Sequence, residues 1–274
     1  MRLLVLSTTL LALAACSAPP AEDAMDSDIE ADDMAMAAQT QSNDHISAAV
    51  NDPSRPESET ARDAGRHPAD VLTFAGVQPG WRVAELGAGS GYYSRILSSA
   101  VGADGEVISE NMDWLIQRFP STDEAISSLA SERSNVTRLV TPTASVLEGY
   151  ENELDAAFMM LIYHDQTWQP EGIPTPTAED RAAMNRSIYD ALRPGGVFLV
   201  VDHRAEDGTG DSMAGVHHRI DEAFVREEVL AAGFELVAES DLLANPDDSR
   251  TTSVFDPSIR GNTDRFVLLF RKPL

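Results

Sequence analysis

The feature that most constrains the fold is a glycine-rich turn between a strand-like and a helix-like segment. Residues 82–86 have the apolar character of a buried strand, and residues 92–101 carry apolar side chains at helical spacing. Between them, Gly87, Gly89 and Gly91 follow a G-x-G-x-G spacing. Glycine permits positive φ and a close approach of the main chain to a ligand, and the following helix offers free N–H groups. The turn therefore predicts a ligand site at the end of the first strand.

The rest of the chain alternates strand-like and helix-like segments, with no internal repeat. We expect further strands at residues 107–108, 136–140, 155–163, 197–201, 234–239 and 266–270. We expect helices at residues 68–76, 177–192 and 221–233. Strands that alternate with helices form a parallel sheet covered on both faces, and the last two strands, which have no helix between them, indicate one antiparallel edge. The expected fold is α/β and doubly wound, with a mostly parallel seven-stranded sheet and an antiparallel last strand.

The first residues, 1–16, predict export. Arg2 precedes an apolar stretch that is too short to span a bilayer, and small residues follow. The ending Leu13-Ala14-Ala15-Cys16 resembles the lipobox of bacterial lipoprotein signal peptides, which implies cleavage before Cys16 and acylation of its thiol. The alternative is an ordinary signal peptide with a chance cysteine nearby. We expect an exported protein on the periplasmic side, with membrane contact through a lipid anchor at Cys16.

Residues 17–52 predict a disordered acidic tether between this signal and the folded domain, 53–274. The segment holds nine acidic residues and no Lys or Arg, and no apolar period is sustained in it. The whole chain has 45 Asp and Glu against 20 Lys and Arg, a net charge of −25, which argues against nucleic acid as a partner. A single cysteine excludes an internal disulfide and a Cys-rich metal site.

An acid before the glycine turn makes the pattern more specific. Glu85 lies two positions before Gly87, and the G-x-G-x-G spacing differs from the G-x-G-x-x-G that cradles a pyrophosphate. Residues 83–92 resemble the class I (Rossmann-like) methyltransferases that use S-adenosylmethionine. Residues 192–196 resemble the same family, and residues 63–66, 91–93 and 263–273 resemble a group of predicted bacterial methyltransferases of unknown substrate within it. The resemblance implies S-adenosyl-L-methionine as cofactor and methyl transfer to an unidentified small-molecule acceptor.

The resemblance also implies which residues hold the cofactor. They lie at the ends of the first two strands: Glu85, Gly87, Ala88, Gly89, Gly91, Tyr92, Glu110 and Asn111. Glu85 would orient the ammonium group of the cofactor, and the glycines would make room for its methionine chain. By register the family's ribose-binding acid falls on Asn111, so either Asn111 replaces it or Glu110 takes that role. The acid that often follows the third strand, near the adenine, is also missing.

Candidate catalytic residues follow the fourth and fifth strands. Ligands of such sheets bind beyond the carboxyl ends of the strands, where this chain places His164, Asp165 and His203. Either histidine is a candidate base if the acceptor carries a proton that must leave. The alternative is that these side chains only form hydrogen bonds at the strand ends.

His217 and His218 precede Asp221, and together with His164 and His203 they are possible ligands of a metal ion. Asp221 fits better as the cap of a helix, and nothing in the spacing demands an ion. We therefore expect no metal.

Two other function classes compete with methyl transfer. The cofactor is made in the cytoplasm whereas the signal predicts export, so an exported, lipid-anchored binding module of the same fold, without methyl turnover, stays open. A nicotinamide-dependent oxidoreductase is the third class. The glycine spacing, Glu85 and the antiparallel last strand all count against it.

Overall fold

The computed structural model describes residues 44–274. The expected signal peptide, with Cys16, and most of the expected tether lie outside the described residues. Residues 44–50 are helical, and the side chains of Ile46 and Ala49 are buried in the core. The expected domain boundary after residue 52 is therefore wrong, and the folded part includes residues 44–52. Ile46, Ala49 and Val50 share one helical face, but these three residues in a seven-residue helix give too short a period to be recognised in the sequence.

The described strands form one seven-stranded sheet in the order β3-β2-β1-β4-β5-β7-β6. They are β1 (Arg82–Leu86), β2 (Glu106–Met112), β3 (Val136–Thr141), β4 (Leu154–Met160), β5 (Leu192–His203), β6 (Glu235–Ser240) and β7 (Arg265–Arg271). Strands β1 to β5 pair in parallel, and β7 is antiparallel to both of its neighbours, β5 and β6. The predicted fold class, including its antiparallel last strand, is confirmed.

The last two strands form the expected antiparallel edge of the sheet. Strand β7 inserts between β5 and β6, and β6 takes the edge. The burial pattern explains the order: residues 265–270 of β7 are all buried, whereas β6 alternates exposed and half-buried residues. An apolar run buried on both faces belongs inside a sheet, and an alternating strand suits an edge.

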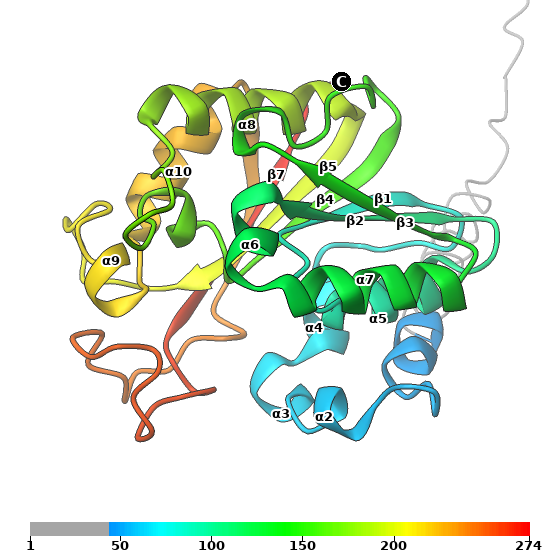
Figure 1. Ribbon diagram of the computed structural model, residues 1–274, viewed down its shortest axis with the longest axis horizontal. Helices are drawn as coiled ribbons and strands as arrows, with labels where there is room; N and C mark the ends of the chain where they lie inside the picture. The colour runs from blue at the N-terminus through cyan, green and yellow to red at the C-terminus, as the bar shows by residue number, and fades with distance from the viewer. Residues whose placement is uncertain (1–43) are drawn as a thin grey trace, which may run out of the picture. The chain divides into compact units, whose positions relative to one another are not determined.

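Helices cover both faces of the sheet (Figure 1). They are α2 (Glu57–Thr60), α3 (Asp63–Arg66), α4 (Pro68–Phe74), α5 (Tyr92–Val101), α6 (Asp113–Arg118), α7 (Pro120–Glu132), α8 (Ala178–Ala191), α9 (Ala214–His217) and α10 (Glu222–Ala231). One apolar cluster joins α4, α5, α7 and residues 44–50 to one face, and a second joins α6, α8 and α10 to the other. Neighbours in a strand point to opposite clusters, as Val83 and Ala84 do.

Local sequence signals predicted α4, α5, α8 and α10 with ends close to those observed. Thr177 and Asp180 form the expected capping box of α8, and Asp221 accepts a hydrogen bond from the Ala223 amide at the start of α10. Residues 113–132, for which no helix was expected, form α6 and α7. Helix α7 buries only Ile126 and Leu129, so its apolar period is weak.

Strand β4 ends earlier than predicted, and the reason bears on the site. We expected the strand to continue to Tyr163, but Leu161 adopts φ 61°, a left-handed backbone conformation that residues other than glycine rarely adopt. The chain leaves the sheet there and forms the 3₁₀ turn η2 (His164–Gln166). This turn carries two of the candidate catalytic residues. No helix within residues 44–274 has the length and apolar character needed to cross a membrane.

Candidate functional site

The glycine turn lies at the carboxyl end of β1 and leads into α5. Gly87, Gly89 and Gly91 all have positive φ, at 62°, 59° and 85°. The turn is tied to the adjacent strand, because the Ala88 amide donates to the Glu110 carbonyl oxygen at 2.9 Å. The sequence therefore has glycine at the three positions where the main chain is left-handed.

The residues expected to contact the ribose hold this turn in place. Glu110 Oε2 accepts a hydrogen bond from the Gly87 amide at 3.2 Å, and its Oε1 accepts one from the Thr141 hydroxyl at 2.7 Å. Asn111 Oδ1 accepts from the Gly89 amide at 2.8 Å, and Asn111 Nδ2 donates to the Gly89 carbonyl at 3.0 Å. Both side chains are buried. Glu110 and Asn111, at the end of β2, therefore hold the turn in its conformation, and we call these two residues the brace.

The three glycines differ in what a side chain would meet. A Cβ atom at Gly87 would lie 2.8 Å from Ile162, and one at Gly91 would lie 2.9 Å from Ile126. A Cβ atom at Gly89 would meet nothing within 4 Å. Packing within the fold therefore favours glycine at positions 87 and 91, whereas the Cα of Gly89 faces open space although its amide and carbonyl are both hydrogen-bonded to Asn111.

Glu85 lies beneath the turn and is directed at α5. Its carboxylate accepts a hydrogen bond from the Ser94 hydroxyl, and Ser109 donates to the Ser94 Oγ at 2.7 Å. Burial raises the pKa of Glu85 to about 7, and the hydrogen bond from Ser94 opposes part of that rise. The side chain is 3% exposed, so it fixes the start of α5 and does not reach open space in this structure.

Tyr92, expected at the cofactor, is covered by the N-terminal helices. Its hydroxyl donates to Asp63 Oδ1 at 2.5 Å, and the ring faces the guanidinium groups of Arg55, Arg62 and Arg66 at 5.4, 4.6 and 4.6 Å. Burial is the main cause that raises the pKa of the hydroxyl above its ordinary range. Tyr92 therefore links the glycine turn to α3 and its arginines.

Two of the predicted catalytic residues lie together beyond β4. His164 Nδ1 lies 2.7 Å from Asp202 Oδ1, and the His164 amide donates to the other oxygen of that carboxylate at 2.8 Å. His164 Nε2 lies 3.3 Å from Asp165 Oδ1. Burial alone would lower the pKa of His164, but the charges of Asp202 and Asp165 outweigh it and raise the pKa to about 9. A histidine held in its cationic form is a poor general base at neutral pH.

His203, the third predicted catalytic residue, lies beside His164 at the end of β5, but its protonation state differs. Its ring centroid lies 5.8 Å from that of His164, and its Nδ1 lies 2.7 Å from the Thr263 hydroxyl. Burial is the largest of the causes that lower the pKa of His203 well below its ordinary value, and the positive charge of His164 lowers it further. His203 is therefore neutral at physiological pH, unlike His164.

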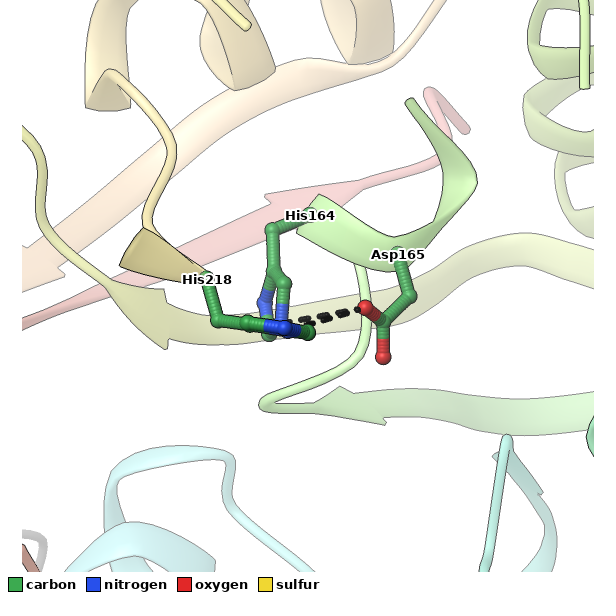
Figure 2. A group of neighbouring side chains, drawn as sticks. All are labelled: His164, Asp165 and His218. Atoms are coloured by element: carbon green, nitrogen blue, oxygen red, sulfur yellow. Dashed lines mark ion pairs between the residues drawn. The ribbon is translucent and has the colours of Figure 1, made fainter. Parts of the chain in front are cut away.

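The fold brings His218 next to His164 and Asp165 (Figure 2). We call His164, Asp165, His203 and His218 the histidine rim. His218 follows α9 in a left-handed conformation, with φ 54°, and its Nδ1 lies 3.4 Å from Asp165 Oδ1. One donor atom each from His164, Asp165 and His218 lies within 4.8 Å of the others, an arrangement that suits a metal ion. From the sequence, His218 was a possible metal ligand together with His217 and Asp221. Asp221 instead caps α10, and His217 lies outside this group.

Two adjoining cavities open beside these residues. One, of about 590 Å³, is lined by His164, Asp165 and His218, and the other, of about 500 Å³, lies beside α3. Both are lined by His203 and Leu161, so they lie on either side of these residues. The left-handed Leu161 thus takes part in shaping the space that the rim histidines face.

The arginines around these cavities share one property. Each is free of an ion pair with a carboxylate of residues 44–274, whereas every other arginine of that range has one. They are Arg62, Arg66, Arg118, Arg260 and Arg265. Arg265 is held by main-chain carbonyls, with Nη1 donating to Gly65 at 2.7 Å. An acidic protein therefore concentrates its unpaired positive charge around one space.

A third cavity, of about 340 Å³, lies beyond the ends of β2 and β3. Asp113, Trp114 and Thr143 are among its lining residues, and Trp114 also lines the 590 Å³ cavity. The buried Trp114 Nε1 has no hydrogen-bond partner within the described part of the chain. A buried N–H without a partner is costly, so a ligand that accepts its hydrogen bond would be favoured.

Several of these residues were missed in the sequence. Arg66, Arg118 and Arg260 come from distant segments, and only the fold brings them to one space. Asp113 directly follows β2, and its position after a strand end was the one available signal.

The buried brace predicts a pH effect on stability. Burial raises the pKa of Glu110 to about 8 from the ordinary 4.5, so between these values the folded chain keeps a proton that the unfolded chain releases. The free energy of unfolding should therefore fall as pH rises through this window. Glu110→Gln should flatten that slope, measured by urea unfolding at several pH values, while the exposed Glu148→Gln keeps it. Equal slopes for Glu110→Gln and the unmodified chain would contradict the assignment.

Comparison with known proteins agrees with this architecture. A family model described as Protein-L-isoaspartate(D-aspartate) O-methyltransferase (PCMT) matches residues 57–152, less than half of the chain, which include the glycine turn and the end of β2. No curated protein sequence matches the chain.

Similar solved structures are numerous, with 1007 matching chains, so the fold by itself does not name a reaction. A SAM dependent methyltransferase from Aquifex aeolicus has a TM-score of 0.51 and 17% identity over 74% of this chain and 88% of its own. The cyclase SpnF has a TM-score of 0.52 and 18% identity over 81% of this chain and 84% of its own. At these identities the likeness establishes the fold alone. The chain therefore has the Rossmann-like fold of class I methyltransferases. Its glycine turn and its histidine rim lie at the carboxyl ends of the strands, where such folds bind ligands.

Proposed function

We propose that the protein transfers a methyl group from S-adenosylmethionine to a small anionic acceptor. The observation that carries the proposal is the glycine turn at the end of β1, which Glu110 and Asn111 of β2 hold in place and in which the Cα of Gly89 faces open space. The family model that matches this part of the chain supports the same activity. S-adenosylmethionine, when bound, supplies an electrophilic methyl group on a sulfonium ion.

The residues present fit such a cofactor at three places. The open side of Gly89 accommodates an amino-acid chain, and Asp113, two residues beyond the expected ribose position, lines the 340 Å³ cavity beyond β2. The unpartnered Trp114 Nε1 is a donor for a ligand group between the two neighbouring cavities. Glu85, Glu110 and Asn111 then act by holding the turn in the conformation that leaves this space open.

The acceptor class follows from charge. The two adjoining cavities hold five arginines without carboxylate partners and one carboxylate, Asp165. A guanidinium that faces a cavity and has no internal counter-charge is stabilised by an anion, and Arg recognises carboxylates and phosphates in particular. Such a cavity would select a carboxylate- or phosphate-bearing acceptor. His203, neutral and on the same rim, is positioned to accept the proton that such an acceptor loses.

We also propose that the chain is exported and anchored through Cys16, as residues 1–16 predict. The sequence pattern alone supports this step. Labelled palmitate should be incorporated into the chain expressed in a bacterium and should be lost in Cys16→Ala. Equal labelling of both chains, or none of either, would contradict the lipid anchor.

The cofactor proposal predicts a specific loss in Gly89→Val. A side chain there would occupy the open space and strain a left-handed residue by roughly 1–2 kcal/mol. Gly76→Val is the matched control, because Gly76 has φ 70° and equally open surroundings, away from the turn. Calorimetric titration should show binding of S-adenosylmethionine and S-adenosylhomocysteine by the unmodified chain and by Gly76→Val, and strongly weakened binding by Gly89→Val.

Equal affinity in both glycine variants would contradict the site, and no binding by the unmodified chain would contradict the function. Binding without methyl transfer to any acceptor would instead favour the exported binding module.

The charge argument predicts a selective effect of Arg66, which lines both cavities. Benzoate and inorganic phosphate should raise the melting temperature of the chain, and benzamide should not. Arg66→Met should reduce the effect of the anions, whereas Arg186→Met, which removes an exposed arginine paired with Asp190, should leave it unchanged. An equal response to benzoate and benzamide would refute the anionic acceptor class.

A further inference from the structure

We propose that His164, Asp165 and His218 form a binding site for a divalent transition-metal ion such as Zn²⁺. The three side chains come from two segments, η2 and the end of α9, and converge on one point (Figure 2). Two imidazole nitrogens and a carboxylate oxygen are donors that Zn²⁺, Co²⁺ and related ions accept. The proposal concerns ion binding, and it stands apart from methyl transfer.

The distances match a shared ion. Asp165 Oδ1 lies 3.3 Å from His164 Nε2 and 3.4 Å from His218 Nδ1. Two donors bound at roughly 2.0–2.1 Å in a tetrahedral arrangement lie about 3.4 Å from each other. The three donor atoms all fall within 4.8 Å, so only a small movement of one histidine brings them around the ion.

The surroundings of His164 are those of a metal-binding histidine. Its other ring nitrogen, Nδ1, lies 2.7 Å from Asp202, whose carboxylate also accepts from the main-chain amides of His164 and His203. Asp202 is fully buried and held by three contacts. A carboxylate in this position fixes the ring orientation and leaves Nε2 as the atom that faces the ion.

His218 is held by packing and by its backbone. It sits in a left-handed conformation, which favours glycine, and its ring lies against Trp168 and Phe255 at centroid distances of 5.6 and 4.8 Å. Both aromatic residues line the 590 Å³ cavity with the three proposed ligands. The aromatic contacts restrict the ring, so the donor atom needs little ordering when the ion binds.

Three protein ligands beside a cavity leave a further coordination position for an exogenous ligand. This pattern is typical of sites that bind a water or a substrate oxygen, whereas structural zinc sites are closed by four protein ligands. If the proposed function holds, an acceptor oxygen is the natural occupant, because Arg66 and His203 line the same cavity. That last step rests on the proposed function, and ion binding does not.

The test is a titration of the untagged full-length chain, freed of metal by a chelator, with Co²⁺ and then Zn²⁺. We expect one ion per chain by calorimetry, the intense visible absorption of four-coordinate Co²⁺, and its loss when Zn²⁺ replaces it. Asp165→Asn and His218→Gln should each weaken binding by about 10-fold or more. Their side chains are 21% and 23% exposed, so these changes open no hole in the core.

Two further variants separate ligands from neighbours. His217→Gln changes the adjacent histidine outside the cluster and should keep full affinity and the Co²⁺ spectrum. Asp202→Asn should weaken binding by about 10–100-fold through the orientation of His164. Absence of stoichiometric binding by the unmodified chain, or full affinity in both Asp165→Asn and His218→Gln, would overturn the proposal. Since no S-adenosylmethionine is present, failure of methyl transfer does not affect either outcome.

Discussion

The site depends on the contact between the end of β2 and the glycine turn that follows β1. Two adjacent side chains, Glu110 and Asn111, accept hydrogen bonds from the amides of Gly87 and Gly89. Parallel pairing of β1 with β2 brings these groups together, since Leu86 is opposite Glu110 in the register. A left-handed turn without these partners would leave buried amides unsatisfied. Glu110 and Asn111 thereby hold the turn so that the Cα of Gly89 faces open space at the carboxyl end of β1.

A second constraint shapes the opposite side of the same space. The left-handed Leu161 ends β4 and turns the chain so that His164 meets the buried Asp202 at the end of β5. From there the rim continues to His203 and His218, and the arginines of α3 and the C-terminal segment close the surrounding cavities. The glycine turn and the histidine rim thus belong to neighbouring strand ends of one sheet, as expected for a ligand site in this class of fold.

Much of the fold could be predicted because its signals are local. The strand before Gly87, the capping box at Thr177 and the cap at Asp221 each depend on a few adjacent residues. The order of the last strands, the packing of Ile46 and the convergence of the arginines depend on contacts between distant segments, which no period or motif encodes. The sequence predicted that Glu110 and Asn111 lie at the end of the second strand, but their hydrogen bonds to the turn required the sheet register.

The central claim is that the space beside Gly89 receives the amino-acid part of S-adenosylmethionine. A crystal structure of the chain grown with S-adenosylhomocysteine tests it most directly. The account predicts the ligand at the carboxyl ends of β1 and β2, with its amino-acid part against the main chain of Gly89. A ligand bound elsewhere, or a turn with the same open space and no ligand at saturating concentration, would contradict it.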